Sequence, residues 1–231
     1  MKKFKIAVDL YQQTTGKLNY TNKLKTAMGN ERLDNINTLT LQHVSETLYP
    51  RASVNTHIRQ VFCPTKAVLY CAANVGWCSK PTIRTPRFRH NPVSAAPCGW
   101  HNQVMGHSPQ NLNAFIHFCF ETGSRTGEAL SLKKSDINFS GSSVFIYSPK
   151  TGQAGVTYIS ECLKRKLNRL PTDGPIFGFN NRTAIYSALK KACKKAGVEY
   201  ITPHRFGRHS FAIEMFNTGS SIALVQKAGR W

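Results

Sequence analysis

The first 78 residues carry apolar side chains at helical spacing and show no strand pattern. Phe4, Ala7, Val8 and Tyr11 recur at intervals of three and four residues, which predicts a helix with one buried face. A break at residues 14–16 separates this helix from a second pattern that runs to residue 28. A third helix is predicted from a cap at Thr38 or Thr40 to residue 48. A fourth pattern covers residues 52–75, where Pro64 can introduce a kink. Together these patterns predict a small all-α bundle.

Residues 79–110 have a different character, because prolines stand at positions 81, 86, 92, 97 and 109. The first part, residues 79–94, also carries Arg84, Arg87 and Arg89. We interpret residues 79–94 as an extended, basic linker between two domains. Two roles remain open for it: a segment that lies along phosphates, or a plain exposed tether.

The remaining residues mix helical and strand patterns. An apolar helix is predicted over residues 111–122, followed by a break at residues 122–128 and a short helix to about residue 134. Residues 143–149 and 156–160 predict the two strands of a β-hairpin, with Lys150 beside its turn. Helices are predicted at about 161–169, capped by Ser160, and at 181–196, ended by Gly197. Two more follow residue 203, so this part is α+β.

Charge indicates the class of partner. The chain has 31 Lys and Arg against 11 Asp and Glu, a formal net charge of +20. Residues 1–92 hold 14 basic and 4 acidic side chains and residues 93–231 hold 17 and 7, so each part carries +10. An excess spread over the whole chain favours a protein that binds a polyanion along its length. The alternative is a basic surface that serves solubility.

Cysteine spacing and hydropathy exclude several classes. The seven cysteines form no CxxC pair, and the metal-like spacing of Cys98 and His101 lacks a second pair, so no metal site is predicted. The count is odd, which favours reduced thiols in a cytoplasmic protein. The N-terminus has no long apolar run after its lysines, and no stretch reaches membrane-spanning length.

Four side chains stand out as candidates for binding a phosphate. Arg125 lies in a glycine-flanked turn after a buried helix, and Arg208 lies on a helix four residues after His204, which predicts a shared helical face. Planar guanidinium groups on rigid elements suit two phosphate oxygens, and an imidazole can donate to a third oxygen or move a proton. Lys150 adds an ammonium at the hairpin tip. With no paired carboxylates in the sequence, the pattern predicts phosphoryl transfer without a metal or other cofactor.

These segments resemble the tyrosine recombinases of the phage integrase family. Residues 122–132, TGSRTGEALSL, are similar to the family's TGxRxxE box, which makes Arg125 its first arginine and Glu128 the supporting carboxylate. The hairpin at Lys150-Thr151-Gly152 resembles the one that carries the family's catalytic lysine, which is then Lys150. Residues 202–212 resemble the HxxR box, with His204 and Arg208, and residues 222–231 resemble the helix before the GH or GW position, with Trp231.

The resemblance implies a mainly α fold in two domains. Residues 1–78 would form an all-α core-binding (SAM-like) domain, and residues 95–231 an α+β catalytic domain with a small sheet, joined by the linker at 79–94. The implied partner is double-stranded DNA, with self-association on DNA and no small-molecule substrate or membrane. The implied DNA-binding residues are Arg59, Arg84, Arg87, Arg89 and Lys150. The implied location is the cytoplasm, on DNA, for a prokaryotic or phage-encoded protein.

The sequence departs from the family pattern in three ways. The box reads H-x-x-x-R, so either His204 or, in a strict register, Arg205 fills the histidine position. The segment Gly229-Arg230-Trp231 also carries one extra residue, so Trp231 and Arg230 are alternatives for the GH or GW position. The third departure concerns the nucleophilic tyrosine, which the family carries shortly after that position and which these 231 residues do not include. Tyr147, Tyr158, Tyr186 and Tyr200 are expected to be packing residues rather than replacements.

The implied reaction is DNA breaking and rejoining through a 3′-phosphotyrosine, which needs neither metal nor ATP. In intact relatives the two arginines would stabilise the phosphorane-like charge, Lys150 would protonate the leaving 5′ oxygen, and His204 would assist the nucleophile. Three hypotheses follow for this chain: a truncated integrase, a non-cleaving DNA-binding relative that occupies recombination sites, or a site completed by a tyrosine from another protomer.

Overall fold

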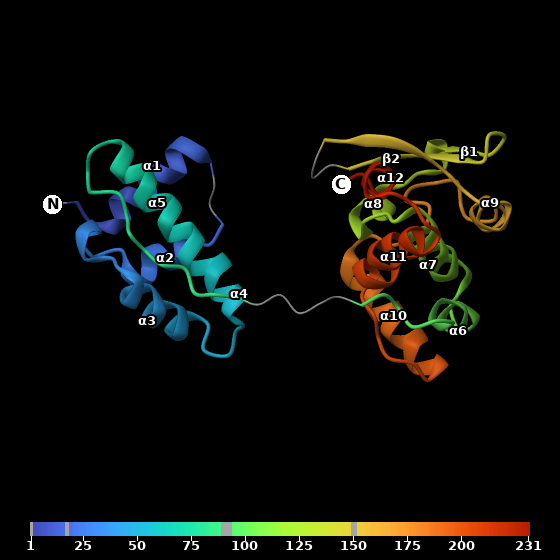
Figure 1. Ribbon diagram of the computed structural model, residues 1–231, viewed down its shortest axis with the longest axis horizontal. Coiled ribbons are helices and arrows are strands. Elements are labelled where there is room, and N and C mark those ends of the chain that lie inside the picture. Colours follow the sequence, from blue (N-terminus) through green and yellow to red (C-terminus); the bar gives the residue numbers. More distant parts are fainter. Residues whose placement is uncertain (1, 17–18, 89–93, 149–151) are drawn as a thin grey trace. The chain divides into compact units, whose positions relative to one another are not determined.

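The structure is a computed structural model that describes residues 2–16, 19–88, 94–148 and 152–231. The chain forms two compact units, Met1–Asn91 and Pro92–Trp231 (Figure 1). The segment expected to be a linker is divided between them, since Ile83 is buried in the core of the first unit. Residues 89–93 of that segment lie outside the described residues.

All the named elements of the first unit are helices, and among its described residues a single antiparallel bridge joins Lys3 and Arg32. Its elements are α1 (Phe4–Thr15), α2 (Thr21–Met28), η1 (Leu33–Asn35), α3 (Thr38–Leu48), α4 (Val54–His57), η2 (Ile58–Phe62) and α5 (Cys63–Asn74). The predicted face of α1 is confirmed, because Phe4, Ala7 and Val8 are buried. The predicted cap of α3 is wrong. The side chain of Asn37 accepts from the backbone N–H groups of Leu39 and Thr40, since an amide oxygen one residue earlier reaches these donors.

The long helix predicted over residues 52–75 contains a π turn. The elements α4, η2 and α5 follow one another without a break, and Pro64 stands in the first turn of α5. Proline has no N–H to donate and its ring clashes with the carbonyl one turn back, so a wider turn before it relieves the conflict. Arg59, one of the expected DNA-binding residues, is exposed on this π turn.

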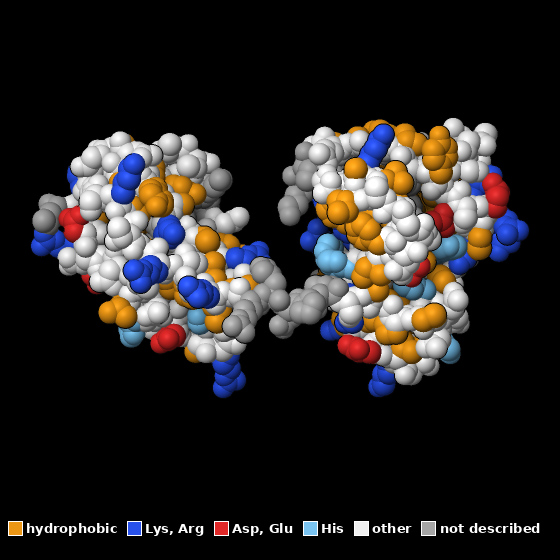
Figure 2. Space-filling model, in the orientation of Figure 1, with side chains coloured by type: hydrophobic (Ala, Val, Ile, Leu, Met, Phe, Trp, Pro, Cys, Tyr) orange, Lys and Arg blue, Asp and Glu red, His pale blue; other side chains and the backbone are white. Residues whose placement is uncertain are grey.

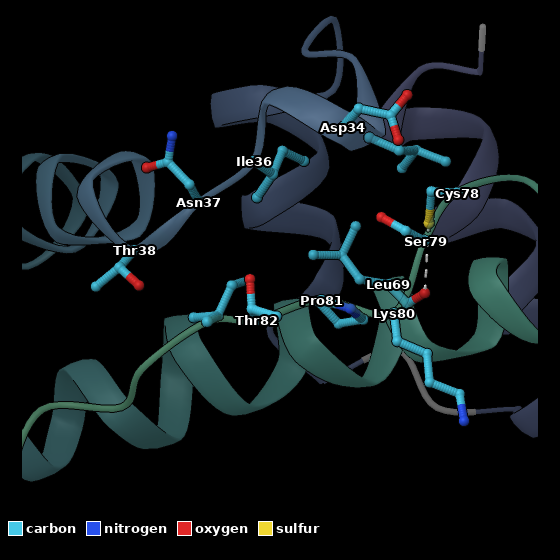
Figure 3. A pocket seen from close by; sticks show the side chains of 12 residues that line it. Asp34, Ile36, Asn37, Thr38, Leu69, Cys78, Ser79, Lys80, Pro81 and Thr82 are labelled. Atoms are coloured by element: carbon cyan, nitrogen blue, oxygen red, sulfur yellow. Dashed lines mark hydrogen bonds between the residues drawn. The ribbon is translucent and has the colours of Figure 1, made fainter.

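A small hollow lies where residues 78–83 pack beside residues 33–38 and Leu69 (Figure 3). Its volume is about 160 Å³, and the thiol of Cys78 donates to the backbone oxygen of Leu69 at its edge. This bond ties the chain after α5 back to that helix. The N–H of Arg84 further along donates to the hydroxyl of Thr38 at 3.1 Å, and the side chains of Arg84 and Arg87 are exposed.

The second unit combines helices with a small sheet. Its elements are α6 (Trp100–Gly106), α7 (Gln110–Thr122), α8 (Thr126–Ser131), η3 (Lys134–Asp136), β1 (Ile137–Asn138), β2 (Ser143–Tyr147), β3 (Ala154–Tyr158), α9 (Glu161–Asn168), α10 (Arg182–Ala196), η4 (His204–His209), α11 (Ser210–Asn217) and α12 (Ile222–Gly229). In Figure 1 the sheet lies at one end of this unit, and α6 and α10 lie at the other.

The predicted hairpin is confirmed and gains a third strand. The sheet has the order β1-β2-β3, all antiparallel, with Ile137 opposite Val144 and Phe145 opposite Val156. Val144 and Ile146 face the core, whereas Phe145 and Tyr147 are exposed. Strand β1 has only two residues, which is too short to show the alternation of apolar and polar side chains that predicts a strand.

The core of the second unit is built around α7, which supplies the largest group of buried residues from any one element: Leu112, Ala114, Phe115, Ile116, Phe118 and Cys119. η4 and α11 pack against this helix. Gly123 ends α7 with φ +62°, and a Cβ there would lie 2.5 Å from the ring of Phe211, so only glycine fits. The predicted mainly α fold with a small sheet is confirmed.

Candidate phosphate site

Arg125 stands at the junction of α7 and α8. It is the residue before α8, and Glu128 in the first turn of that helix accepts from it twice, from Nη1 at 2.7 Å and from the backbone N–H at 2.9 Å. The Glu128 side chain is 2% exposed. Burial, the largest single influence, raises the pKa of its carboxyl, but the hydrogen bonds from Arg125, the Ser148 hydroxyl and the charge of Arg230 together hold the pKa below its usual range.

Arg208 is buried beside this turn with a relative exposure of 1%. Its Nη1 donates to the backbone oxygen of Gly123 at 2.9 Å, and its guanidinium lies 4.1 Å from the ring centre of Trp231. Within the described part of the chain, Nη2 of Arg208 has no hydrogen-bond partner. Burial, and next the charge of Arg125, lower the pKa of Arg208 to about 10, so it is charged at neutral pH.

The additional residue of the H-x-x-x-R box is taken up by a π turn. His204–His209 form the π-helix η4, in which hydrogen bonds run from residue i to i+5. The approach of this turn to α7 needs Gly207, since a Cβ there would lie 2.9 Å from the Cβ of Cys119 and 3.1 Å from its backbone oxygen. Arg208 follows Gly207 and is thereby brought onto the end of α7.

The π turn also changes the neighbours of His204. The sequence predicted that His204 and Arg208 share a helical face, but His204 is exposed whereas Arg208 is buried. The ring of His204 packs edge-on against His209, five positions on, with 4.7 Å between ring centres. Arg205, the alternative for the box position, donates to the backbone oxygen and the hydroxyl of Ser94 at 3.0 and 2.6 Å.

Trp231 and Arg230, the alternatives for the GH or GW position, take different places. The ring of Trp231 lies over Arg208 and folds back on Gly229, where a Cβ would lie 1.7 Å from it. Arg230 has φ +56° and turns inward, with an exposure of 8%. Its Nη2 lies 3.5 Å from Oε2 of Glu128 and donates to the backbone oxygen of Thr122 and to the Ser124 hydroxyl.

The structure thus brings together Arg125, Arg208 and Trp231 of the predicted site. Lys150 and Arg89 lie outside the described residues, although the described strands β2 and β3 that flank Lys150 form the predicted hairpin. The remaining expected DNA-binding residues, Arg59, Arg84 and Arg87, belong to the first unit and are exposed.

Sequence reasoning missed the buried position of Arg230 and its bond to Ser124. Ordinary arginines are exposed, and nothing in their spacing signals burial. A hint was present in the Gly229-Arg230-Trp231 end of the α12 pattern, because a residue after a helix-ending turn often adopts the left-handed conformation and reverses the chain. The buried contacts themselves depend on α7, which lies about 100 residues earlier.

No group of three or more His, Cys, Asp or Glu side chains that could hold a metal occurs among the described residues. His101, from the segment with metal-like spacing, instead bonds the backbone oxygen of Phe206 at 2.9 Å and packs on Phe120. Burial, the largest influence, lowers its pKa. In the ranges that the structure describes, no helix is long and apolar enough to cross a membrane.

Comparisons with known proteins identify the family. The model of the phage integrase family matches residues 101–231, which is more than half of the chain and includes the whole candidate site. The chain therefore belongs to the phage integrase family of tyrosine recombinases.

Curated relatives include tyrosine recombinase XerA of Pyrococcus furiosus, 31% identical over 121 residues, and tyrosine recombinase XerC of Staphylococcus aureus, 26% identical over 125 residues. These matches cover 47% and 48% of this chain and 42% of each relative, so the chain covers less than half of their length.

Solved structures show the same fold at low identity. A lambda integrase dimer bound to a COC′ core site has a TM-score of 0.76 and 16% identity, covering 96% of this chain and 92% of that one. The Tn1549 transposon integrase in complex with transposon right-end DNA has a TM-score of 0.76 and 15% identity, covering 96% and 90%.

Proposed function

We propose that this chain acts in site-specific DNA recombination or integration, binding duplex DNA and holding the reacting phosphodiester at Arg125 and Arg208. One observation carries the proposal: three guanidinium groups, of Arg125, Arg208 and Arg230, surround one turn together with a single carboxylate, Glu128. The formal charges of these four groups sum to +2, and most of the groups are buried. An anion with two exposed oxygens complements such a set.

In the proposed reaction, the hydroxyl of a tyrosine that these 231 residues do not supply attacks the phosphorus, forms a 3′-phosphotyrosyl bond and expels the 5′ oxygen. Arg125 and Arg208 stabilise the charge on the non-bridging oxygens. Nη2 of Arg208 has no hydrogen-bond partner among the described residues and can donate to one of these oxygens. Lys150 delivers the proton to the 5′ oxygen, and His204 takes the proton from the attacking hydroxyl. Trp231 closes one side of the Arg208 guanidinium by stacking on it.

The first test compares Arg125→Ala with Arg169→Ala in duplex DNA binding. Both substitutions remove one positive charge from the second unit, but Arg169 is exposed directly after α9, whereas Arg125 is bonded to the buried Glu128. We expect Arg125→Ala to weaken binding about tenfold or more by loss of a charge-assisted hydrogen-bonding group, with circular dichroism unchanged. Equal affinities in the two variants would refute a phosphate site at Arg125.

The second test asks whether these 231 residues cleave DNA by themselves. A non-cleaving DNA-binding protein that occupies recombination sites is the alternative function. Tyr147 and Tyr158, expected from the sequence to be packing residues, are instead exposed, on the face of the sheet opposite to Gly155 and Arg230. Tyr186 and Tyr200 pack against the core of the second unit as expected. We therefore expect these 231 residues to form no covalent adduct with a nicked suicide substrate. An adduct that survives denaturation, with its tyrosine mapped by mass spectrometry, would contradict this expectation and exclude the non-cleaving alternative.

A further inference from the structure

Arg230 makes more contacts with the turn between α7 and α8 than a surface arginine would. Its Nη2 donates to the backbone oxygen of Thr122 at 3.2 Å and to Oγ of Ser124 at 3.3 Å, and it lies 3.5 Å from Oε2 of Glu128. These partners are buried, and the hydroxyls of Thr122 and Ser124 also bond each other at 2.7 Å.

The contacts of Arg230 and Arg208 alternate along the same turn. Arg230 holds Thr122 and Ser124, and Arg208 holds the backbone oxygen of Gly123 between them. Arg125 is the next residue. The turn that carries Arg125 is therefore held on consecutive residues by two guanidinium groups from the last part of the chain.

The position of Arg230 is itself fixed. It follows the last residue of α12 in the left-handed conformation, with its N–H bonded back to Lys227. Its stem passes over strand β3, where a Cβ on Gly155 would lie 3.5 Å from Cδ of Arg230. Arg230 thus joins α12, β3 and the turn before α8.

We propose that Arg230 is a positioning residue that locks the turn from Thr122 to Arg125 and shares Glu128, so that Arg125 is held ready for a phosphate oxygen. The inference rests on the proposed function, because it assumes that Arg125 and Arg208 bind phosphate. It adds a third arginine whose part is geometric. Nη2 of Arg230 reaches the two turn oxygens while Nη1 donates to the backbone oxygen of Ala228 at 3.2 Å, so the planar guanidinium is fixed through two nitrogens, which the single nitrogen of a lysine does not reproduce.

The test measures the affinity for inorganic phosphate by calorimetry, in chloride buffers of matched ionic strength, for the wild type, Arg230→Lys, Arg230→Met and the control Arg169→Met. We expect phosphate to bind about tenfold or more weakly to both Arg230 variants, and as in the wild type to Arg169→Met. Arg230→Lys keeps the charge, so its loss of affinity isolates the geometry of the fork.

Thermal unfolding in chloride separates positioning from folding. A purely structural role would lower the melting temperature of Arg230→Lys but leave the phosphate affinity of its folded form unchanged, and that result would overturn the inference. Wild-type affinity in Arg230→Lys with weak binding in Arg230→Met would mean charge alone, which also overturns it. Absence of phosphate binding by the wild type would refute the proposed function itself, whereas binding that no Arg230 variant alters refutes only the role of Arg230.

Discussion

The side chains around the turn before α8 carry more positive charge than Glu128 neutralises. Burial, the largest influence, lowers the pKa of both Arg208 and Arg230, because desolvation disfavours their charged forms. Glu128 offsets part of this cost through its contacts with Arg125 and Arg230. The remaining imbalance is what a bound phosphate would correct.

Glu128→Gln tests this balance. The folded-state pKa of Glu128 lies below its usual value, so its stabilising contribution is present above the unfolded-state pKa and is lost as the pH falls through the folded-state pKa. We expect the substitution to lower the free energy of unfolding by about 3 kcal/mol at pH 7 and by much less at acid pH. Urea denaturation at both pH values measures the difference.

The matched control is Glu161→Gln. Glu161 pairs with Lys164 on the surface, where solvent screens the pair, so its removal is expected to change stability little. A destabilisation by Glu128→Gln that stays the same from neutral to acid pH would contradict the charge argument.

At the scale of elements, the π turn η4 decides where Arg208 lies. It packs on α7 at Gly207, and the wider turn accommodates the extra residue of the box without moving α11 away from α7. π turns inside helices are frequent at functional sites, and each holds one more residue than an α-helical turn. A second π turn, η2, relieves Pro64 in the first unit.

Gly207→Ala tests the close approach to α7. The added Cβ would lie 2.9 Å from the Cβ of Cys119, so either η4 or α7 must shift. We expect a loss of about 1–3 kcal/mol in the free energy of unfolding, measured by urea denaturation. Gly106→Ala is the control, because a Cβ there meets nothing within 4 Å; stability equal to the wild type in both variants would contradict the packing argument.

Most elements could be predicted from the sequence because their apolar periodicity is local. The helix α7, the hairpin β2–β3 and the caps at Ser160 and Gly197 follow from spacing and turn chemistry. The helix α6 was hidden among prolines, although Trp100 and Val104 are spaced as a buried helical pair. The burial of Arg208 and Arg230 could not be predicted, since it arises only when distant segments pack together.

At the scale of the whole molecule, the basic charge is the common property of the two units. Lys and Arg side chains appear on the visible face of both units, with few acidic ones between them (Figure 2). The formal charge of +20 is divided equally between residues 1–92 and 93–231. Affinity for DNA should therefore draw on both units and depend on the release of counterions.

The salt dependence of duplex DNA affinity tests the central claim most directly. If both units contact phosphates, with six or more contacts in total, the logarithm of the association constant should fall with the logarithm of salt concentration with a slope of about −5 or steeper. Fluorescence anisotropy between 50 and 200 mM salt, roughly the range over which such proteins lose a thousandfold in affinity, provides the measurement. A slope near zero would contradict the proposal that this chain binds DNA through its phosphates.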